Sequence, residues 1–271
     1  MLHLRVLYDL LTGLYATSLV LFFMDVVQPK RKVNRLAVFL LFFVFLCETI
    51  ILMTRLHAFG YVPVYSRFDA LLLISWLILL IALVVNAFFR VDLFLFFVNV
   101  LGFGIVLFDS FARVGSLTYA SHQRDLLTYH ISFAILSYAL FSLSFILSVM
   151  YLLQETLLRK RQWNSWFLRL PSLERLDTFA YRCVIAGFPL LLLSGILGAI
   201  WAWLVLHKLL LFDPKPIATF IVWCMYGVYL TTRMKSGWGG TRLSWYNLLC
   251  FVGVIVNFWV IGDVSAFHHA A

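Results

Sequence analysis

Residues 130–154 read HISFAILSYALFSLSFILSVMYLLQ and contain no Lys, Arg, Asp or Glu. A helix of about 20 apolar residues crosses the hydrocarbon core of a bilayer, because each residue adds about 1.5 Å to its length. In lipid the backbone must satisfy its own hydrogen bonds, and a continuous helix does so. This stretch therefore predicts a membrane-spanning helix.

The rest of the chain has the same apolar character. Of its 271 residues, 63% are hydrophobic and 12% are charged, and the mean hydropathy is +0.98. A soluble domain is roughly half apolar and about a quarter charged, and a disordered chain is more polar still. The apolar runs are continuous and do not alternate with period two, which argues against a β-barrel. The composition predicts an all-α polytopic integral membrane protein with a single membrane domain over residues 1–271.

Eight apolar runs are long enough to be spans. The third and fourth are separated only by residues 90–92, which predicts a tight helical hairpin. The first run carries Asp9 and has no small-residue cleavage site before the next loop, so we interpret it as a retained span rather than a signal peptide. The eight predicted spans are 4–25, 36–56, 68–89, 91–110, 130–154, 179–206, 217–233 and 243–263.

The basic residues predict the orientation of these spans. One side of the predicted topology holds fourteen of the 21 Lys and Arg residues and the other side holds seven. Cytoplasmic loops carry the excess of Lys and Arg, so the first side is predicted to be cytoplasmic and both termini to lie outside. The basic positions on the predicted cytoplasmic side are in 26–35, 155–182 and 233–242 and at Arg90.

The net charge of +9 is explained by these loops. Basic clusters beside spans contact the anionic headgroups of membrane lipid, and no nucleic-acid-binding motif accompanies them. We therefore expect membrane lipid and no nucleic acid among the partners. A docking site for a cytoplasmic protein is the alternative interpretation of the longest such loop, 157–177.

Histidine placement is the most informative polar feature. On the predicted topology all seven histidines fall on the outer side or at its membrane edge. Imidazole is the commonest metal ligand and titrates near neutral pH, so the group fits haem or metal ligation or a proton-sensitive surface. Solvated loop or tail positions are the alternative for most of them. The seven are His3, His57, His122, His130, His207, His268 and His269.

Other chemistry is less well supported. Asp9 and Glu48 lie deepest in predicted spans, and we expect a structural hydrogen bond or a neutral carboxyl there, because a proton relay needs more such groups. The four cysteines form no CxxC pair and are interpreted as buried small hydrophobes. No GxSxG, HExxH, GxGxxG or Walker motif is present, so classical soluble-enzyme chemistry is not indicated.

Several stretches over residues 60–269 resemble the cytochrome c assembly protein family of haem-handling membrane proteins. Their order and spacing agree with the family pattern. More weakly, PVYSRFDALLLISW at 63–76 is similar to the family's Pro…Glu…Trp segment, with Asp69 in place of Glu. The stronger stretches are LLTYHISFAILSYALF at 126–141, PSLERLDTFAYRCVIAGFPLLLLSGILGAIWA at 171–202, FDPKP at 212–216, YGVYLTTR at 226–233, GWGGTR at 237–242 and Phe267-His268.

The resemblance implies a haem site. In the family, two outer-side histidines flank a tryptophan-rich segment and are associated with haem iron; by motif they fall on His130 and His268. The topology derived from Lys and Arg puts both on the outer side. Two imidazoles on opposite faces of a porphyrin would give a low-spin iron. The implied haem-pocket candidates are Trp201, Trp203, His207, Asp213 and Pro214.

The chain also departs from the family pattern. The motif, approximately WAxxxWGxYWxWDPKE, reads WAWLVLHKLLLFDPKP from Trp201. Plain apolar residues and His207 replace its later Trp, Gly and Tyr positions, and Pro216 replaces the Glu. Thr231 stands where cytochrome c synthases usually carry a membrane histidine. These departures resemble the HemX-type branch, whose members are bacterial cell-membrane proteins with eight spans.

The branch implies a regulatory role without enzymatic activity: negative control of the abundance of glutamyl-tRNA reductase, the first committed enzyme of tetrapyrrole synthesis. Cytoplasmic loops 155–178 and 234–242 would present a surface to the reductase or to a protease. Two alternatives remain. One is a haem-delivery component of a cytochrome c synthase, and the other is a transporter of haem or another small molecule.

Overall fold

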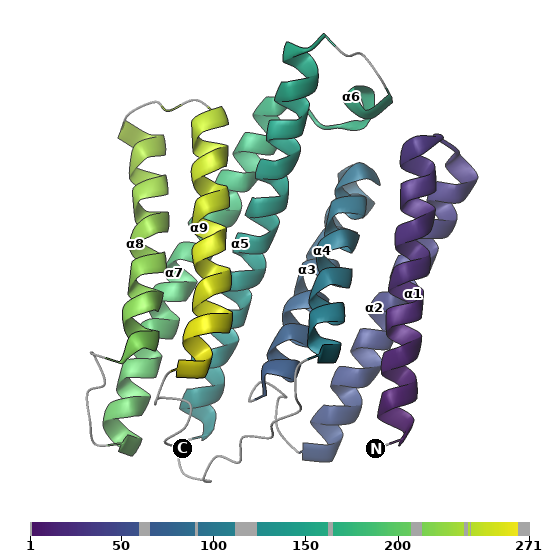
Figure 1. Ribbon diagram of the computed structural model, residues 1–271. Helices are drawn as coiled ribbons and strands as arrows, with labels where there is room; N and C mark the ends of the chain where they lie inside the picture. Colours follow the sequence, from purple (N-terminus) through teal and green to yellow (C-terminus); the bar gives the residue numbers. More distant parts are fainter. Residues whose placement is uncertain are drawn as a thin grey trace. The chain divides into compact units, whose positions relative to one another are not determined.

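The computed structural model is helical wherever it assigns regular structure. It describes residues 2–59, 66–89, 92–111, 124–161, 165–206, 213–235, 238 and 240–264. Figure 1 shows the helices in chain order. Their bounds are α1 Leu2–Val27, α2 Arg31–Phe59, α3 Arg67–Phe89, α4 Asp92–Phe111, α5 Arg124–Arg159, α6 Ser165–Arg169, α7 Leu173–Leu206, α8 Pro214–Lys235 and α9 Gly240–Val264.

These helices confirm the all-α class and the membrane character of the chain. Almost every residue of the eight predicted runs lies in a helix. Within the described residues, six helices are long and apolar enough to cross a membrane, and α4 contains a shorter apolar helix, Leu93–Phe108. The number of crossings and the sidedness of the termini stay predictions. Helix α6, five residues long, was not predicted, and α7 continues through Pro189 instead of breaking there.

The chain forms two compact units. The first comprises Met1–Gly115 and Thr156–Ser172, and the second comprises Ser116–Glu155 and Leu173–Ala271. The first unit thus contains α1 to α4 together with α6, and the second contains most of α5 with α7, α8 and α9. Each unit is described by itself below.

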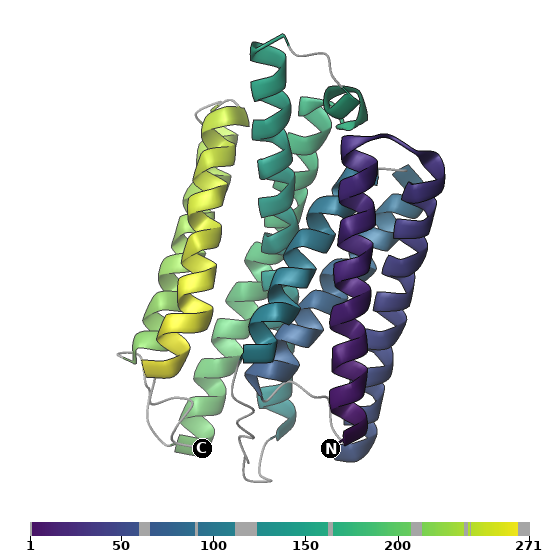
Figure 2. The same ribbon diagram turned by 45° about the vertical axis from the view of Figure 1, so that its right-hand side comes forward.

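In the first unit, one face of α1 points inward. Its buried positions Leu11, Tyr15, Ser18 and Phe22 follow the spacing of three and four residues that places side chains on one helix face. Helix α2 runs back beside α1, as the two views show (Figures 1 and 2). The Ser18 hydroxyl donates to the Ala37 carbonyl on α2 at 3.1 Å, and this bond fixes the position of one helix along the axis of the other.

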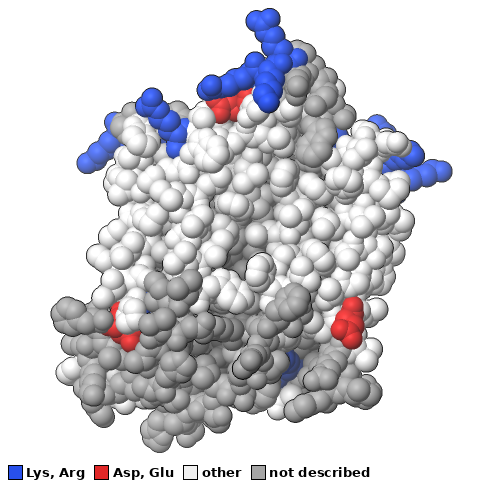
Figure 3. Space-filling view, viewed as in Figure 1, with Lys and Arg blue, Asp and Glu red and all other residues white. Residues whose placement is uncertain are grey.

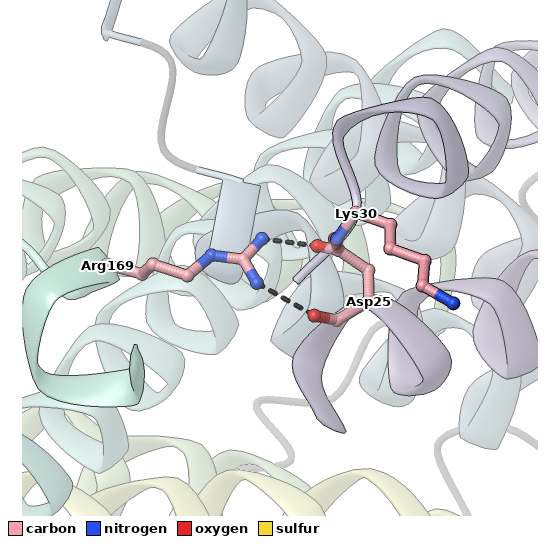
Figure 4. A network of polar contacts seen from close by, with 3 residues as sticks. All are labelled: Asp25, Lys30 and Arg169. Carbon is pink, nitrogen blue, oxygen red and sulfur yellow. Dashed lines mark hydrogen bonds and ion pairs between the residues drawn. The ribbon is translucent and has the colours of Figure 1, made fainter. Parts of the chain in front are cut away.

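An ion pair attaches α6 to the turn between α1 and α2. The guanidinium of Arg169 pairs with the Asp25 carboxylate and also donates to the Asp25 carbonyl at 3.0 Å (Figure 4). The other carboxylate oxygen of Asp25 accepts the backbone N–H of Lys30 at 2.9 Å. Two of the predicted cytoplasmic basic stretches, 26–35 and 155–182, therefore meet at one end of this unit.

In the second unit, serines of α5 bond to its neighbours. Ser137 and Ser144 are fully buried and donate to carbonyls of α7, at Gly187 (2.9 Å) and Ala180 (3.0 Å) respectively. Asn247 of α9 donates to the Ser144 hydroxyl at 2.7 Å. Small polar side chains let helices approach closely in lipid and add hydrogen bonds that apolar contacts cannot supply.

The basic residues of the second unit mark one of its ends. Arg233, at the end of α8, forms an ion pair with Asp177, at the start of α7. Figure 3 shows Lys and Arg at the turn from α8 to α9, and residues other than Lys, Arg, Asp and Glu over the face between this end and the opposite one. In the first unit the same view shows Lys and Arg at the turn from α1 to α2. The sequence prediction that basic residues gather at helix ends is confirmed for these turns.

Candidate functional site

His130 lies in the second turn of α5 and contacts α7. Its Nδ1 is 2.6 Å from the carbonyl oxygen of Ser194. The Ser194 hydroxyl donates to the His130 carbonyl at 2.9 Å and lies 3.1 Å from Nδ1. Both the ring and the backbone of His130 are therefore held by one residue of α7.

The contact with Ser194 selects a tautomer of the neutral ring. A carbonyl oxygen can only accept a hydrogen bond, so Nδ1 must carry the hydrogen and donate it. The basic lone pair of a neutral His130 is then on Nε2. A backbone carbonyl bonded to one ring nitrogen is the arrangement that orients imidazole for metal ligation through the other.

Gly198 allows the ring to lie close to α7. A Cβ atom at this position would be 2.7 Å from Cε1 and 2.8 Å from Nδ1 of His130, closer than nonbonded atoms approach. Gly198 is one turn beyond Ser194 on the same helix face. The neighbouring Gly195 has no atom within 4 Å of its own Cβ position. The requirement for glycine is therefore specific to position 198.

The start of α8 is built by two of the predicted pocket residues. Asp213 is largely buried, and its carboxylate accepts the backbone N–H of Lys215 at 3.0 Å, which caps the helix. Pro214 occupies the first helical position, where its missing N–H leaves no bond unmade. The Asp213-Pro214 pair thus starts α8.

Lys215 connects the start of α8 to α9. Its ammonium donates to the Asn257 carbonyl at 2.6 Å and interacts electrostatically with His130. The Asn257 amide donates to the hydroxyls of Tyr138 on α5 (3.1 Å) and Thr219 on α8 (3.2 Å). Three helices therefore converge around Asn257, about two turns along α5 from His130.

The two tryptophans of the motif point differently. Trp201 is 3% exposed, whereas Trp203 is 55% exposed. Residues two positions apart on a helix lie on opposite faces. Trp201 shares the inner face of α7 with Gly198, one turn before it, while Trp203 faces away from the interior of the unit.

Other predicted residues are less informative. His207 and His268 lie outside the described residues, so the predicted pairing of His130 with His268 stays a prediction. His57, the histidine at the end of α2, is exposed. Sequence reasoning missed Ser194 and Gly198, although a pair of small residues four positions apart in an apolar helix indicates close helix approach.

The site lies at the end of the second unit opposite its basic end. Ser194 is seventeen positions beyond Asp177, the partner of Arg233, on α7, which corresponds to about 25 Å along the helix. His130 is therefore nearly a bilayer core away from the Lys and Arg of the α8–α9 turn. Which side of the membrane each of these ends faces stays a prediction.

The residues around His130 are of the chemical types that haem sites use. An imidazole of defined tautomer, a buried indole on the same helix face as its glycine contact, and a nearby ammonium are the groups that ligate iron, contact a macrocycle and pair with propionates. No cluster of three or more His, Cys, Asp or Glu side chains that could hold a bare metal ion occurs among the described residues.

Comparisons with known proteins decide the family. The family model described as "Cytochrome C assembly protein" matches residues 13–268. The chain belongs to the cytochrome c assembly protein family. The match begins at residue 13, so the family likeness extends into the first two helices, beyond the region 60–269 that the motifs indicate.

The chain is similar to proteins that carry two different names. Protein HemX of Bacillus subtilis is 37% identical over 258 residues, which is 94% of each chain. Protein HemX of Brevibacillus brevis is 37% identical over 270 residues, 99% of each chain. Cytochrome c biogenesis protein CcsA of Guillardia theta is 28% identical over 230 residues, covering 76% of this chain and 75% of its own. The chain is an integral membrane protein of the HemX type within the family.

Proposed function

We propose that this chain is a haem-binding regulator that lowers the abundance of glutamyl-tRNA reductase, without enzymatic activity of its own. The observation that carries the proposal is the 37% identity with two HemX proteins over nearly the whole of both chains. The altered tryptophan motif and Thr231 support this branch over the synthases.

Haem binding is supported by the geometry around His130. In this proposal Nε2 of His130 ligates the iron, and the Ser194 carbonyl holds the ring in the required tautomer. Haem, when bound, supplies an iron centre whose ligation changes with redox state or haem supply. His268 is the proposed second ligand, on the basis of the family motif. Trp201 and Lys215 are proposed to contact the macrocycle and a propionate.

The proposed topology connects haem to the reductase. Eight spans with both termini outside would place His130 on the outer side of a bacterial cytoplasmic membrane. Loops 155–178 and 234–242 would then face the cytoplasm and contact the reductase or a protease. A ligand changes such a surface only if it binds two helix arrangements unequally.

Delivery of haem to a cytochrome c synthase is the second candidate function. It is favoured by the 28% identity with the CcsA protein of Guillardia theta over about three quarters of both chains. A protein that hands over haem would be expected to keep the aromatic platform, and this chain has Leu209 and Leu210 in its place. Transport of haem or another small molecule is the third candidate; the sequence shows no visible inverted repeat, and only the 187–198 region of the predicted spans is rich in Gly and Pro.

A gene deletion separates these functions. Regulation predicts raised glutamyl-tRNA reductase protein with normal covalently haemylated cytochromes, measured by immunoblot and haem stain. Lost cytochromes with unchanged reductase would instead support delivery. The deletion is complemented with the wild-type chain and with His130→Ala, and regulation by haem predicts that His130→Ala fails to restore the low reductase level.

Haem titration of the purified chain tests the site directly. The wild-type chain in detergent is expected to give a Soret band with added hemin, and His130→Ala to lose it. Gly198→Ala should weaken binding about tenfold, as loss of an orienting contact does, because its methyl group displaces the His130 ring. Gly195→Ala is the matched control, since its methyl group meets no atom. Equal binding by both glycine variants would contradict the site.

A further inference from the structure

A second polar site lies in the first unit, and the proposed function does not use it. Glu48 of α2 is fully buried, and its Oε1 accepts hydrogen bonds from the Tyr15 hydroxyl of α1 at 3.1 Å and from the Ser75 hydroxyl of α3 at 2.7 Å. The two hydroxyls are also 3.0 Å from each other. Side chains from three helices therefore meet around one carboxylate oxygen.

Helix α4 closes this site without adding a side chain to it. A Cβ atom at Gly102 would be 2.7 Å from the Tyr15 hydroxyl, so only glycine lets Tyr15 reach Glu48 at this level. Gly104, two residues on, has no atom within 4 Å of its Cβ position. The site is thus shaped by all four long helices of the unit.

The site lies deep in the helices. Tyr15 is thirteen positions from the start of α1 and twelve from its end, which corresponds to about 18 Å of helix or slightly more on each side. Ser75 is eight residues from the start of α3, or about 12 Å. An ionisable side chain at such a depth in a membrane unit is expensive and usually marks a function.

The second oxygen of Glu48 has an unmet bonding capacity. Oε2 is buried and has no hydrogen-bond partner among the described residues. The groups that face Glu48 are Tyr15 from α1 and Ser75 from α3, with Cys47 next to it on its own helix. In the part of the chain that is described, Glu48 takes part in no ion pair. An ionised carboxylate in an apolar interior needs a positive charge or more donors, and these neighbours supply neither to Oε2.

The polar character continues one turn along α1. Ser18 accepts a hydrogen bond from the Asn99 amide of α4 at 3.1 Å. Asn99 is fully buried, and its Oδ1 also lacks a hydrogen-bond partner within the described residues. Oε2 of Glu48 on α2 and Oδ1 of Asn99 on α4 therefore both lack a donor among the described residues, and their partners Tyr15 and Ser18 are one turn apart on α1.

We propose that Glu48 is a proton-binding site within the first unit. In the binding step a hydronium ion gives its proton to Oε2: one O–H bond breaks in hydronium, one forms on Oε2, and water is released. Oε1 keeps its bonds to Tyr15 and Ser75 in both states. A proton fits better than a metal cation, because hard cations take about six oxygen ligands, and the carboxylate with two hydroxyls provides fewer.

A hydrophobic carbodiimide tests the proposal. Dicyclohexylcarbodiimide reacts with the protonated form of a membrane carboxyl and leaves a stable adduct, which mass spectrometry locates in the Glu48 peptide. The full-length chain in lipid vesicles is expected to be labelled at Glu48 at low pH but not at alkaline pH, and to be labelled equally in NaCl and KCl at constant pH. Glu48→Gln should lose that label entirely.

A matched pair of glycine variants tests the geometry. Gly102→Ala pushes the Tyr15 hydroxyl away from Glu48, so the pH at which labelling is half complete should shift, whereas Gly104→Ala should leave it unchanged. Absence of a Glu48 adduct at every pH, while the exposed Asp9 is labelled, would overturn the proposal. Protection by NaCl at constant pH would also overturn it, because the site would then hold a metal cation.

Discussion

The ion pair between Arg169 and Asp25 should hold α6 in place, and its removal should release this helix locally. The side chain of Asp25 is 3% exposed and that of Arg169 is 22% exposed. Breaking a fully buried pair costs about 3–5 kcal/mol, whereas an exposed pair contributes about 0–1 kcal/mol. Arg169 lies between these cases, and Asp25 keeps its bond from the Lys30 N–H. Arg169→Ala should therefore cost about 2 kcal/mol.

This free energy sets the size of the expected signal. Each 1.4 kcal/mol corresponds to about tenfold in an equilibrium constant, so the opening equilibrium of α6 should rise about 30-fold. Hydrogen exchange of backbone amides reports local opening directly. Peptides covering α6 in the detergent-solubilised chain should exchange about 30 times faster in Arg169→Ala, while peptides from the middle of α1 should not change.

Two further variants make the measurement decisive. Arg175→Ala removes an exposed arginine six residues away and should leave α6 exchange unchanged. Asp25→Asn removes the charge but keeps an oxygen for Lys30, and combined with Arg169→Ala it should show non-additivity of about 1–3 kcal/mol, as contacting residues do. The reasoning is refuted if Arg169→Ala and Arg175→Ala give the same α6 exchange rate.

Three other variants should change stability measurably. Gly187→Ala places a methyl group 2.8 Å from Cε1 of Phe141 and should lower the free energy of unfolding by about 1–3 kcal/mol. Gly13→Ala is its control in thermal unfolding, because no atom lies within 4 Å of the Cβ position of Gly13. Equal melting temperatures of the two variants would contradict the packing. Asn247→Ala removes two bonds to α5 serines and should cost about 1 kcal/mol; an unchanged melting temperature would mean that the bonds contribute nothing. Asp213→Ala removes the cap of α8 and should cost about 1 kcal/mol, whereas Asp213→Asn, which can cap, should melt near the wild type.

The helices themselves could be predicted from the sequence, because in lipid a long apolar run has almost no other stable structure. Helix α6 could not. It has five residues and follows no apolar run, and its place depends on Arg169 contacting Asp25, 144 residues away in the chain. Local composition carries no information on a contact between residues so far apart in the chain. The distribution of Lys and Arg did predict that both basic stretches belong to one side of the membrane.

In the candidate site, His130 could be predicted from the sequence, but the residues of α7 that contact it could not. The family motif and the Lys and Arg distribution directed attention to His130, and the structure places it opposite a basic end. Ser194 and Gly198 were missed, because their role depends on how α7 is rotated against α5. Two small residues four apart indicate a close helix contact, but they do not say which residue of which helix they meet.

Asp9 and Glu48 show why rotation is difficult to derive for such helices. In the sequence both are single carboxyls inside apolar runs, and both were expected to lie deep. Asp9 is exposed on α1, whereas Glu48 is fully buried on α2. In a soluble protein the apolar stripe of a helix would show which of the two carboxyls is buried. Here phenylalanines and leucines also cover the lipid-facing surface, as Phe39 and Phe42 do on α2. The inner face is marked instead by serine, asparagine, tyrosine and close-contact glycine, so in this chain the polar minority, rather than the apolar majority, determines how the helices pack.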